Sequence, residues 1–131
     1  MTKNETEIEN PRGELALRTL AMPADTNPSG DIFGGWLLSQ MDIAGALVAN
    51  QIAKGRVATV AIDSMIFHQP VNVGDVVCCY AETLKLGRTS LTMLVQVWVL
   101  RQNTIVRDKV TEGEFTYVAL GDDRKPRPIP G

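Results

Sequence analysis

A single long apolar helical pattern, followed only by strand patterns, restricts the possible folds of this chain most strongly. From about Ile32 to Lys54, apolar residues cover most of the helical circumference, so this helix should be buried on most sides. The apolar runs that follow are rich in β-branched residues and are separated by turn residues, which is typical of strands. They span residues 57–67, 76–86, 90–100 and 105–120. The fold must therefore cover one helix with strands.

The N-terminal third of the chain completes an α+β domain. Residues 14–22 indicate a first strand that Pro23 ends, and the prolines and glycines of residues 23–35 predict a structured loop. Asp31 is expected beside the first helical turn, where it would suit the helix dipole, and Lys54 with Gly55 at the helix end. No second helical pattern could supply a parallel crossover. We therefore expect a strongly curved antiparallel sheet wrapped around one long central helix.

Length and composition indicate one domain. A chain of 131 residues with 44% apolar residues can build a single core, expected over residues 14–120, with a flexible arm at 1–13 and a tail at 121–131. The net charge of −2 gives no electrostatic reason to expect nucleic acid. No apolar run approaches the roughly 18 residues of a membrane span, and the first residues do not resemble a signal peptide. We expect a cytoplasmic protein without membrane or nucleic-acid partners.

Neither a metal site nor a disulfide is predicted. Cys78 and Cys79 are neighbours in a strand pattern, so their side chains should point to opposite faces of the sheet. They are expected to be small apolar residues in a reducing compartment. The chain has one histidine, His68, and no Cys-x-x-Cys motif, so a zinc site lacks ligands.

Asp42 is the residue that most clearly suggests chemistry. On a helical wheel it shares its side of the helix with Leu38 and several small residues, and no basic residue lies three or four positions away. The small residues are Gly35, Gly45, Ala46, Ala49 and Ala53. One sheet covers only part of a helix, so this small-residue stripe is expected to stay exposed and to meet a second subunit or a ligand. A structural aspartate paired with a distant cation remains the alternative.

Residues 17–42 carry the most specific motif, LRTLAMPADTNPSGDIFGGWLLSQMD. This run closely resembles bacterial acyl-CoA thioesterases of the YciA type, in the hotdog superfamily. The resemblance continues in residues 55–60, 70–80, 87–90 and 97–99. It implies the hotdog fold and hydrolysis of short-to-medium or broader-range acyl-CoA to a free acid and CoA. It also implies dimers that commonly assemble into trimers of dimers, and no cofactor, since CoA is part of the substrate and product.

The resemblance also assigns residues to the active site. By position, the catalytic carboxylate is Asp42, the loop asparagine is Asn27, and the glycines of the helix start are Gly34 and Gly35. In this superfamily the active site lies at the dimer interface. Asn27 and Asp42 of one site are therefore expected to come from different subunits.

The chemistry of thioester hydrolysis suits these residues. Asp42 could activate water as a general base or attack directly to give a mixed anhydride, and the sequence leaves both routes open. Gly34 and especially Gly35 would present free N–H groups at a helix start as an oxyanion hole, although close packing is the other common reason for a glycine pair. The Asn27 amide could position the water or the thioester carbonyl, or simply stabilise a turn.

A turn in the second half of the chain is the candidate CoA-binding segment. In a hairpin turn, backbone N–H groups, hydroxyl groups and a guanidinium can contact phosphate together. The candidates are Gly87, Arg88, Thr89 and Ser90, with Arg56 and then Lys125 or Arg127 as weaker ones. A solvated turn without a ligand is the alternative.

One alternative catalytic arrangement and two alternative functions compete with this hypothesis. A serine–histidine–aspartate triad is disfavoured because the chain has a single histidine and no Gly-x-Ser-x-Gly motif. His68 is instead expected at a strand end or interface, or in the wall of the substrate channel. A catalytically silent acyl-CoA-binding protein on the same fold would have no need to bury Asp42. A hotdog hydratase or dehydratase would use an aspartate and a histidine in a different loop motif.

Overall fold

The computed structural model describes residues 9–101 and 106–130 and has the expected hotdog architecture. Its elements are β1 (Glu14–Leu20), a 3-10 turn η1 (Pro23–Asp25), α1 (Gly34–Ala53), β2 (Val57–Phe67), β3 (Val76–Leu86), β4 (Ser90–Leu100) and β5 (Arg107–Ala119). The strands form one antiparallel sheet in the order β1-β3-β4-β5-β2. Neither described range contains a helix long and apolar enough to cross a bilayer. The cytoplasmic location stays a prediction.

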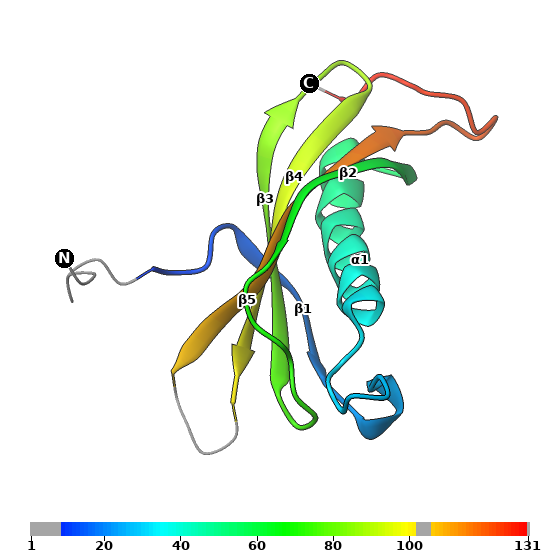
Figure 1. The fold of residues 1–131 in the computed structure, drawn as a ribbon. Coiled ribbons are helices and arrows are strands. Elements are labelled where there is room, and N and C mark those ends of the chain that lie inside the picture. Colours follow the sequence, from blue (N-terminus) through cyan, green and yellow to red (C-terminus); the bar gives the residue numbers. More distant parts are fainter. Residues whose placement is uncertain (1–8, 102–105, 131) are drawn as a thin grey trace.

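The helix α1 packs along one face of the twisted sheet (Figure 1). Its buried side chains, including Leu37, Met41, Ala44 and Val48, join the inward-facing strand residues in a single core. Every strand pairing contains at least one register irregularity, such as the one on β2 just after Thr59. Bulges of this kind increase local twist and bend a sheet, so they help the sheet to curve around the helix.

The helix begins two residues later than predicted. Phe33 has an extended backbone, with ψ of 135°, and donates its N–H group to the Asp25 carbonyl at 3.0 Å. The first turn, from Gly34, therefore contains no acidic residue. Asp31 lies three residues before it and lines the same groove as Gly34, so it is beside the helix start as predicted. The predicted end is confirmed, since Lys54 terminates the helix in a left-handed conformation with φ of 55°.

Two strands also differ from the prediction by one or two residues at their ends. β1 ends at Leu20 because Ala21 leaves the sheet and exchanges backbone hydrogen bonds with the loop at residues 74–75. β5 spans residues 107–119 instead of 105–120, and Leu120 forms an isolated bridge with Pro126. The turn expected between the last two strands falls mainly on residues 102–105, which lie outside the described residues. The division of the chain into arm, domain and tail stays a prediction.

The two cysteines lie on opposite faces of β3, as predicted, and both are buried and free. Cys79 belongs to the core beneath α1, whereas Cys78 packs with Tyr80 and Trp98 on the outer face. Burial and the neighbouring Cys78 raise the pKa of the Cys79 thiol to about 12. The thiol is therefore protonated near neutral pH and is a packing residue.

Candidate active site

Asp42 lies in the middle of α1 and is half-buried, with its carboxylate held by two hydroxyl groups from the sheet. Thr59 donates to Asp42 Oδ1 at 2.6 Å. The Tyr117 hydroxyl contacts the same oxygen at 3.1 Å and the Asp42 backbone carbonyl at 2.9 Å. Within residues 9–101 and 106–130, no cation lies within ion-pair distance of this carboxylate, and Oδ2 has no hydrogen-bond donor. The alternative of a structural ion pair is therefore not supported.

No sequence pattern points to Thr59 or Tyr117. They are opposite each other in the pairing of β2 with β5, so their side chains emerge side by side on the face toward α1. Tyr117 is fully buried, and burial together with the nearby Asp42 raises its pKa well above the usual range. Its hydroxyl therefore stays protonated and acts as a donor. Only the three-dimensional pairing of these distant segments reveals the arrangement.

The prediction of an exposed small-residue stripe on α1 is wrong for most of its members. Gly45, Ala49 and Ala53 are buried, because small side chains allow the helix to approach the sheet closely. Large apolar side chains are exposed instead. They are Phe33, Ile43 and Leu47 at the helix, and Val60, Ile62, Ile66 and Phe67 on the edge strand β2, each at least 38% exposed. An apolar face beside an edge strand is typical of a protein interface.

The start of α1 opens onto a groove of about 320 Å³ lined by Asn27, Gly34 and His68. The Asn27 side-chain oxygen accepts two N–H groups of its own loop, at 2.9 and 3.1 Å, which leaves the amide NH₂ group as the available donor. Among the described residues, no acceptor contacts the N–H groups of Gly34 and Gly35. A Cβ at Gly35 would meet nothing within 4 Å. The helix start thus presents accessible N–H groups at the positive end of the helix dipole.

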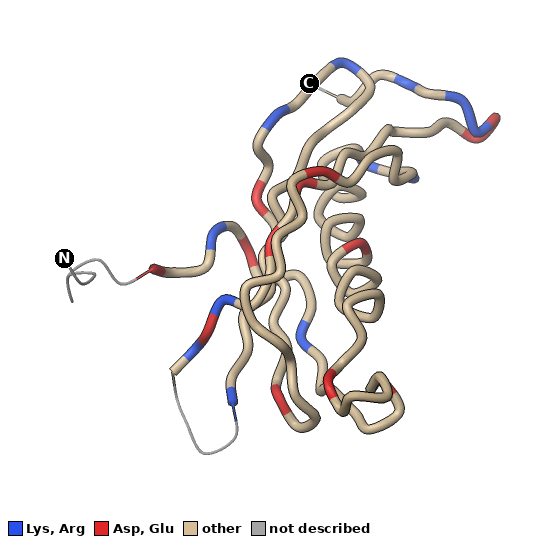
Figure 2. Tube along the Cα trace, viewed as in Figure 1, with Lys and Arg blue, Asp and Glu red and all other residues tan. Residues whose placement is uncertain are grey.

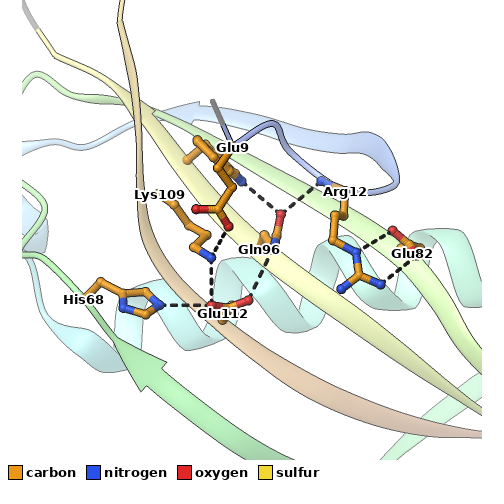
Figure 3. A network of polar contacts seen from close by, with 8 residues as sticks. Glu9, Arg12, His68, Glu82, Gln96, Lys109 and Glu112 are labelled. Atoms are coloured by element: carbon orange, nitrogen blue, oxygen red, sulfur yellow. Dashed lines mark hydrogen bonds and ion pairs between the residues drawn. The ribbon is translucent and has the colours of Figure 1, made fainter. Parts of the chain in front are cut away.

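His68, which forms part of the wall of this groove, is anchored from the outer face of the sheet. Its Nε2 lies 3.0 Å from Glu112 Oε2, and Glu112 also contacts Lys109 and Gln96 (Figure 3). Burial alone would raise the pKa of Glu112, but the contacts with Lys109, His68 and Gln96 outweigh it and hold that pKa below its usual range. No serine or threonine hydroxyl in the described part of the chain hydrogen-bonds to His68, so a serine–histidine–aspartate triad is not assembled.

The candidate CoA-binding turn lies at the other end of α1. The Gly87 N–H group donates to the Ser90 carbonyl at 2.7 Å and closes the turn between β3 and β4. The carbonyls of Arg88 and Thr89 accept N–H groups from the C-terminal segment and the end of β5, each at 2.8 Å. The Arg88 side chain is exposed and has no polar contact with the rest of the described chain. Figure 2 shows Lys and Arg along both this turn and the C-terminal segment.

The weaker CoA candidates lie close to this turn but differ in their availability. Arg56 and Arg127 line one groove of about 370 Å³ at the end of α1. The Arg127 guanidinium already donates to the Ala53 carbonyl at 2.8 Å and the Leu120 carbonyl at 3.0 Å, so it caps the helix and fixes the C-terminal segment. Arg56 and Lys125 are exposed. Arg127 is therefore the least suited of these residues to bind phosphate.

One protomer does not bring the predicted catalytic groups together. Gly35 and Asp42 are seven residues apart on α1, which separates them by about 10.5 Å along the helix axis. An attacking atom and an oxyanion donor both lie about 3 Å from the reacting carbonyl group. The candidate CoA-binding turn is still further from Gly35, because it lies at the opposite end of α1, whose 20 residues span about 30 Å.

Comparison with known proteins identifies the family. The family model "Thioesterase superfamily" matches residues 29–106. The acyl-CoA thioester hydrolase YciA of Salmonella typhimurium is 57% identical over 129 residues, covering 95% of this chain and 97% of that protein. The chain belongs to the YciA family of acyl-CoA thioester hydrolases. As a member of the YciA family it is an enzyme, an acyl-CoA hydrolase.

Solved structures agree with this assignment to the YciA family. A hexameric thioesterase from Yersinia pestis is 59% identical, with a TM-score of 0.89 over 93% of this chain and 99% of that one. A hexameric broad-specificity acyl-coenzyme A thioesterase, carrying an aspartate-to-alanine substitution, is 52% identical. Its TM-score is 0.88, covering 91% of this chain and 88% of that one. The expected hotdog fold is thereby confirmed.

Proposed function

We propose that this enzyme hydrolyses short-to-medium acyl-CoA at sites shared between two subunits. Asp42 acts as the general base or nucleophile, and the N–H groups of Gly35 and Gly34 stabilise the oxyanion. The observation that carries the proposal is the state of the Asp42 carboxylate, which has one oxygen bound by two hydroxyl groups and one oxygen without a donor in the described protomer. A relative of broad acyl specificity supports an extended substrate range.

A shared site follows from the separation of the catalytic groups along α1. If two helices pair in opposite directions about a two-fold axis, Asp42 of one subunit can approach the helix start of the other. The exposed apolar side chains of α1 and β2 supply a surface for such pairing. Because similar enzymes are hexameric, we further propose that three dimers assemble into a hexamer.

The proposed reaction needs only protein groups and water. In the general-base route, Asp42 accepts a proton from water while the water oxygen attacks the thioester carbon. In the nucleophilic route, Asp42 Oδ2 forms a mixed anhydride that water then hydrolyses. In both routes the Gly35 N–H group supports the oxyanion, and the Asn27 amide orients the carbonyl or the water. The C–S bond breaks when the tetrahedral intermediate collapses, and CoA leaves as a thiolate that takes up a proton. In the nucleophilic route this collapse forms the anhydride, so CoA leaves before water hydrolyses it.

The substrate range can be tested with a panel of acyl-CoA thioesters and a thiol reagent. We expect release of free CoA from acetyl-CoA and butyryl-CoA, because the proposed site holds the thioester and the CoA moiety and leaves the acyl group against an apolar surface. Palmitoyl-CoA measures how far the range extends. Absence of release from every thioester would contradict the hydrolase proposal, and release from palmitoyl-CoA alone would contradict the short-to-medium range.

The CoA-binding turn predicts a separate kinetic effect. Replacing the exposed Arg88 by Glu should raise the KM for butyryl-CoA about tenfold and change kcat less than about twofold, because the phosphates of CoA are remote from the reacting carbonyl. Lys85→Glu, a change of equal charge at an exposed position on β3, is the matched control. Equal KM values for Arg88→Glu and the unmodified enzyme would reject the assignment, and equal increases in both variants would indicate a general charge effect.

A further inference from the structure

We propose that Tyr117 and Thr59 are positioning residues that bind one oxygen of Asp42 and thereby select the other, Oδ2, as the atom that reacts. This inference rests on the proposed function, in which Asp42 is the base or nucleophile. Tyr117 and Thr59 themselves need not touch the substrate. Their role would be to fix the orientation of the carboxylate before substrate binds.

The hydrogen bonds make the two carboxylate oxygens chemically different. Both hydroxyl groups contact Oδ1, at 2.6 Å from Thr59 and 3.1 Å from Tyr117. The single proton of the Tyr117 hydroxyl is shared between Oδ1 and the Asp42 backbone carbonyl, so this hydrogen bond is bifurcated. Together with the bond from Thr59 it still makes Oδ1 a weaker base and nucleophile than Oδ2. With Oδ1 held in this way, rotation of the Asp42 side chain is restricted, and Oδ2 has a defined direction.

The sheet places the two donors with little freedom. Thr59 and Tyr117 are directly paired across β2 and β5, and the irregularity in β2 begins immediately after Thr59. The bulge therefore leaves this pair in regular register. Tyr117 is fully buried, and its ring stacks against Phe115 with ring centres 6.5 Å apart. The position of its hydroxyl is thus determined by the core.

Gly45 is required for Tyr117 to reach Asp42. A Cβ atom at position 45 would lie 2.3 Å from the Tyr117 hydroxyl oxygen, far inside van der Waals contact. With no side chain at Gly45, this hydroxyl also bonds the Asp42 backbone carbonyl at 2.9 Å. Tyr117 therefore fixes both the backbone and the side chain of Asp42. The absence of a side chain at Gly45 is explained by this contact.

The test removes each hydroxyl group and retains the shape of the side chain. Tyr117→Phe and Thr59→Val should each lower kcat for butyryl-CoA by about 10- to 100-fold and leave KM within about twofold, because a displaced catalytic group impairs the chemical step. Thr59→Ser keeps a hydroxyl at the same position and should restore most of the kcat. A role in folding alone would not produce this split between kcat and KM or the rescue by serine.

Matched controls exist for both changes. Tyr80→Phe removes a phenol hydroxyl on the outer face, where it contacts Arg107, and Thr92→Val removes a hydroxyl that contacts Thr116. Both controls should retain kcat. If Tyr117→Phe and Thr59→Val also retain kcat while Asp42→Ala is inactive, the positioning role is overturned and the proposed function stands. If Asp42→Ala is itself active, the proposed function fails. Because Thr59 lies on the exposed edge strand, its variants decide the question even if Tyr117→Phe does not fold.

Discussion

The Asp42→Ala enzyme is expected to lose at least about 1000-fold in kcat for butyryl-CoA, because both proposed routes depend on this carboxylate. Its fold should survive, since the Tyr117 hydroxyl keeps its bond to the backbone carbonyl at position 42, which alanine retains. The side chain is only half-buried, so little packing is lost. The measurement is release of free CoA with a thiol reagent, together with thermal unfolding and the molecular mass in solution.

Two further variants make the Asp42→Ala result specific. Asp42→Asn keeps the size and hydrogen-bonding capacity of the side chain but removes its charge, so it should be nearly as inactive as Asp42→Ala. Asp108→Ala removes a carboxylate that contacts Arg101 and should retain activity. An Asp42→Ala enzyme that keeps more than about a tenth of the normal kcat would contradict a catalytic role for Asp42.

Gly35→Pro should lower kcat by about 100- to 1000-fold, the usual cost of losing one oxyanion donor. Proline removes the backbone N–H group and is tolerated in the first turn of a helix, where that group has no helical acceptor. The preceding residue is Gly34, whose flexibility reduces the restriction that proline places on its neighbour. We expect the change to affect the reaction more than the stability of the helix.

Gly35→Ala is the matched control for the proline variant. It adds a side chain at the same position but keeps the N–H group, and a Cβ there meets no atom within 4 Å in the described protomer. It should therefore retain much more activity than Gly35→Pro. Similar losses in the two variants would indicate that space at the helix start, and not the N–H group, is the important property.

The elements of the fold were predictable because their signals are local. The apolar helix and the β-branched runs are continuous in the sequence, and β2, β3 and β4 have the predicted boundaries. The start of α1 lies later than the helical pattern predicts, because a loop contact from Phe33 to Asp25 competes with the first helical turn. Helical periodicity cannot show such a contact.

The surroundings of the candidate site were less predictable, because they depend on contacts between distant segments. Thr59 and Tyr117 are 58 positions apart in the sequence and meet only through the pairing of β2 with β5. The exposure of the small-residue stripe on α1 also depends on contacts between distant segments. A helical wheel shows which residues share a face of the helix, but not which face the sheet covers. The charge of Arg127 suggests a phosphate ligand, whereas its hydrogen bonds to backbone carbonyls reveal a structural role.

The most direct test of a site built from two subunits is to co-express Asp42→Ala and Gly35→Pro subunits. In a mixed dimer, one site carries both defects and the other carries neither. Random pairing makes about half of the dimers mixed, so about a quarter of all sites should be intact. The kcat per site should therefore recover to about a quarter of the normal value. Each variant expressed alone should remain nearly inactive. Recovery close to that fraction is the result we predict. Activity no higher than that of the two separate variants, with mixed dimers demonstrated by mass, would contradict the shared active site.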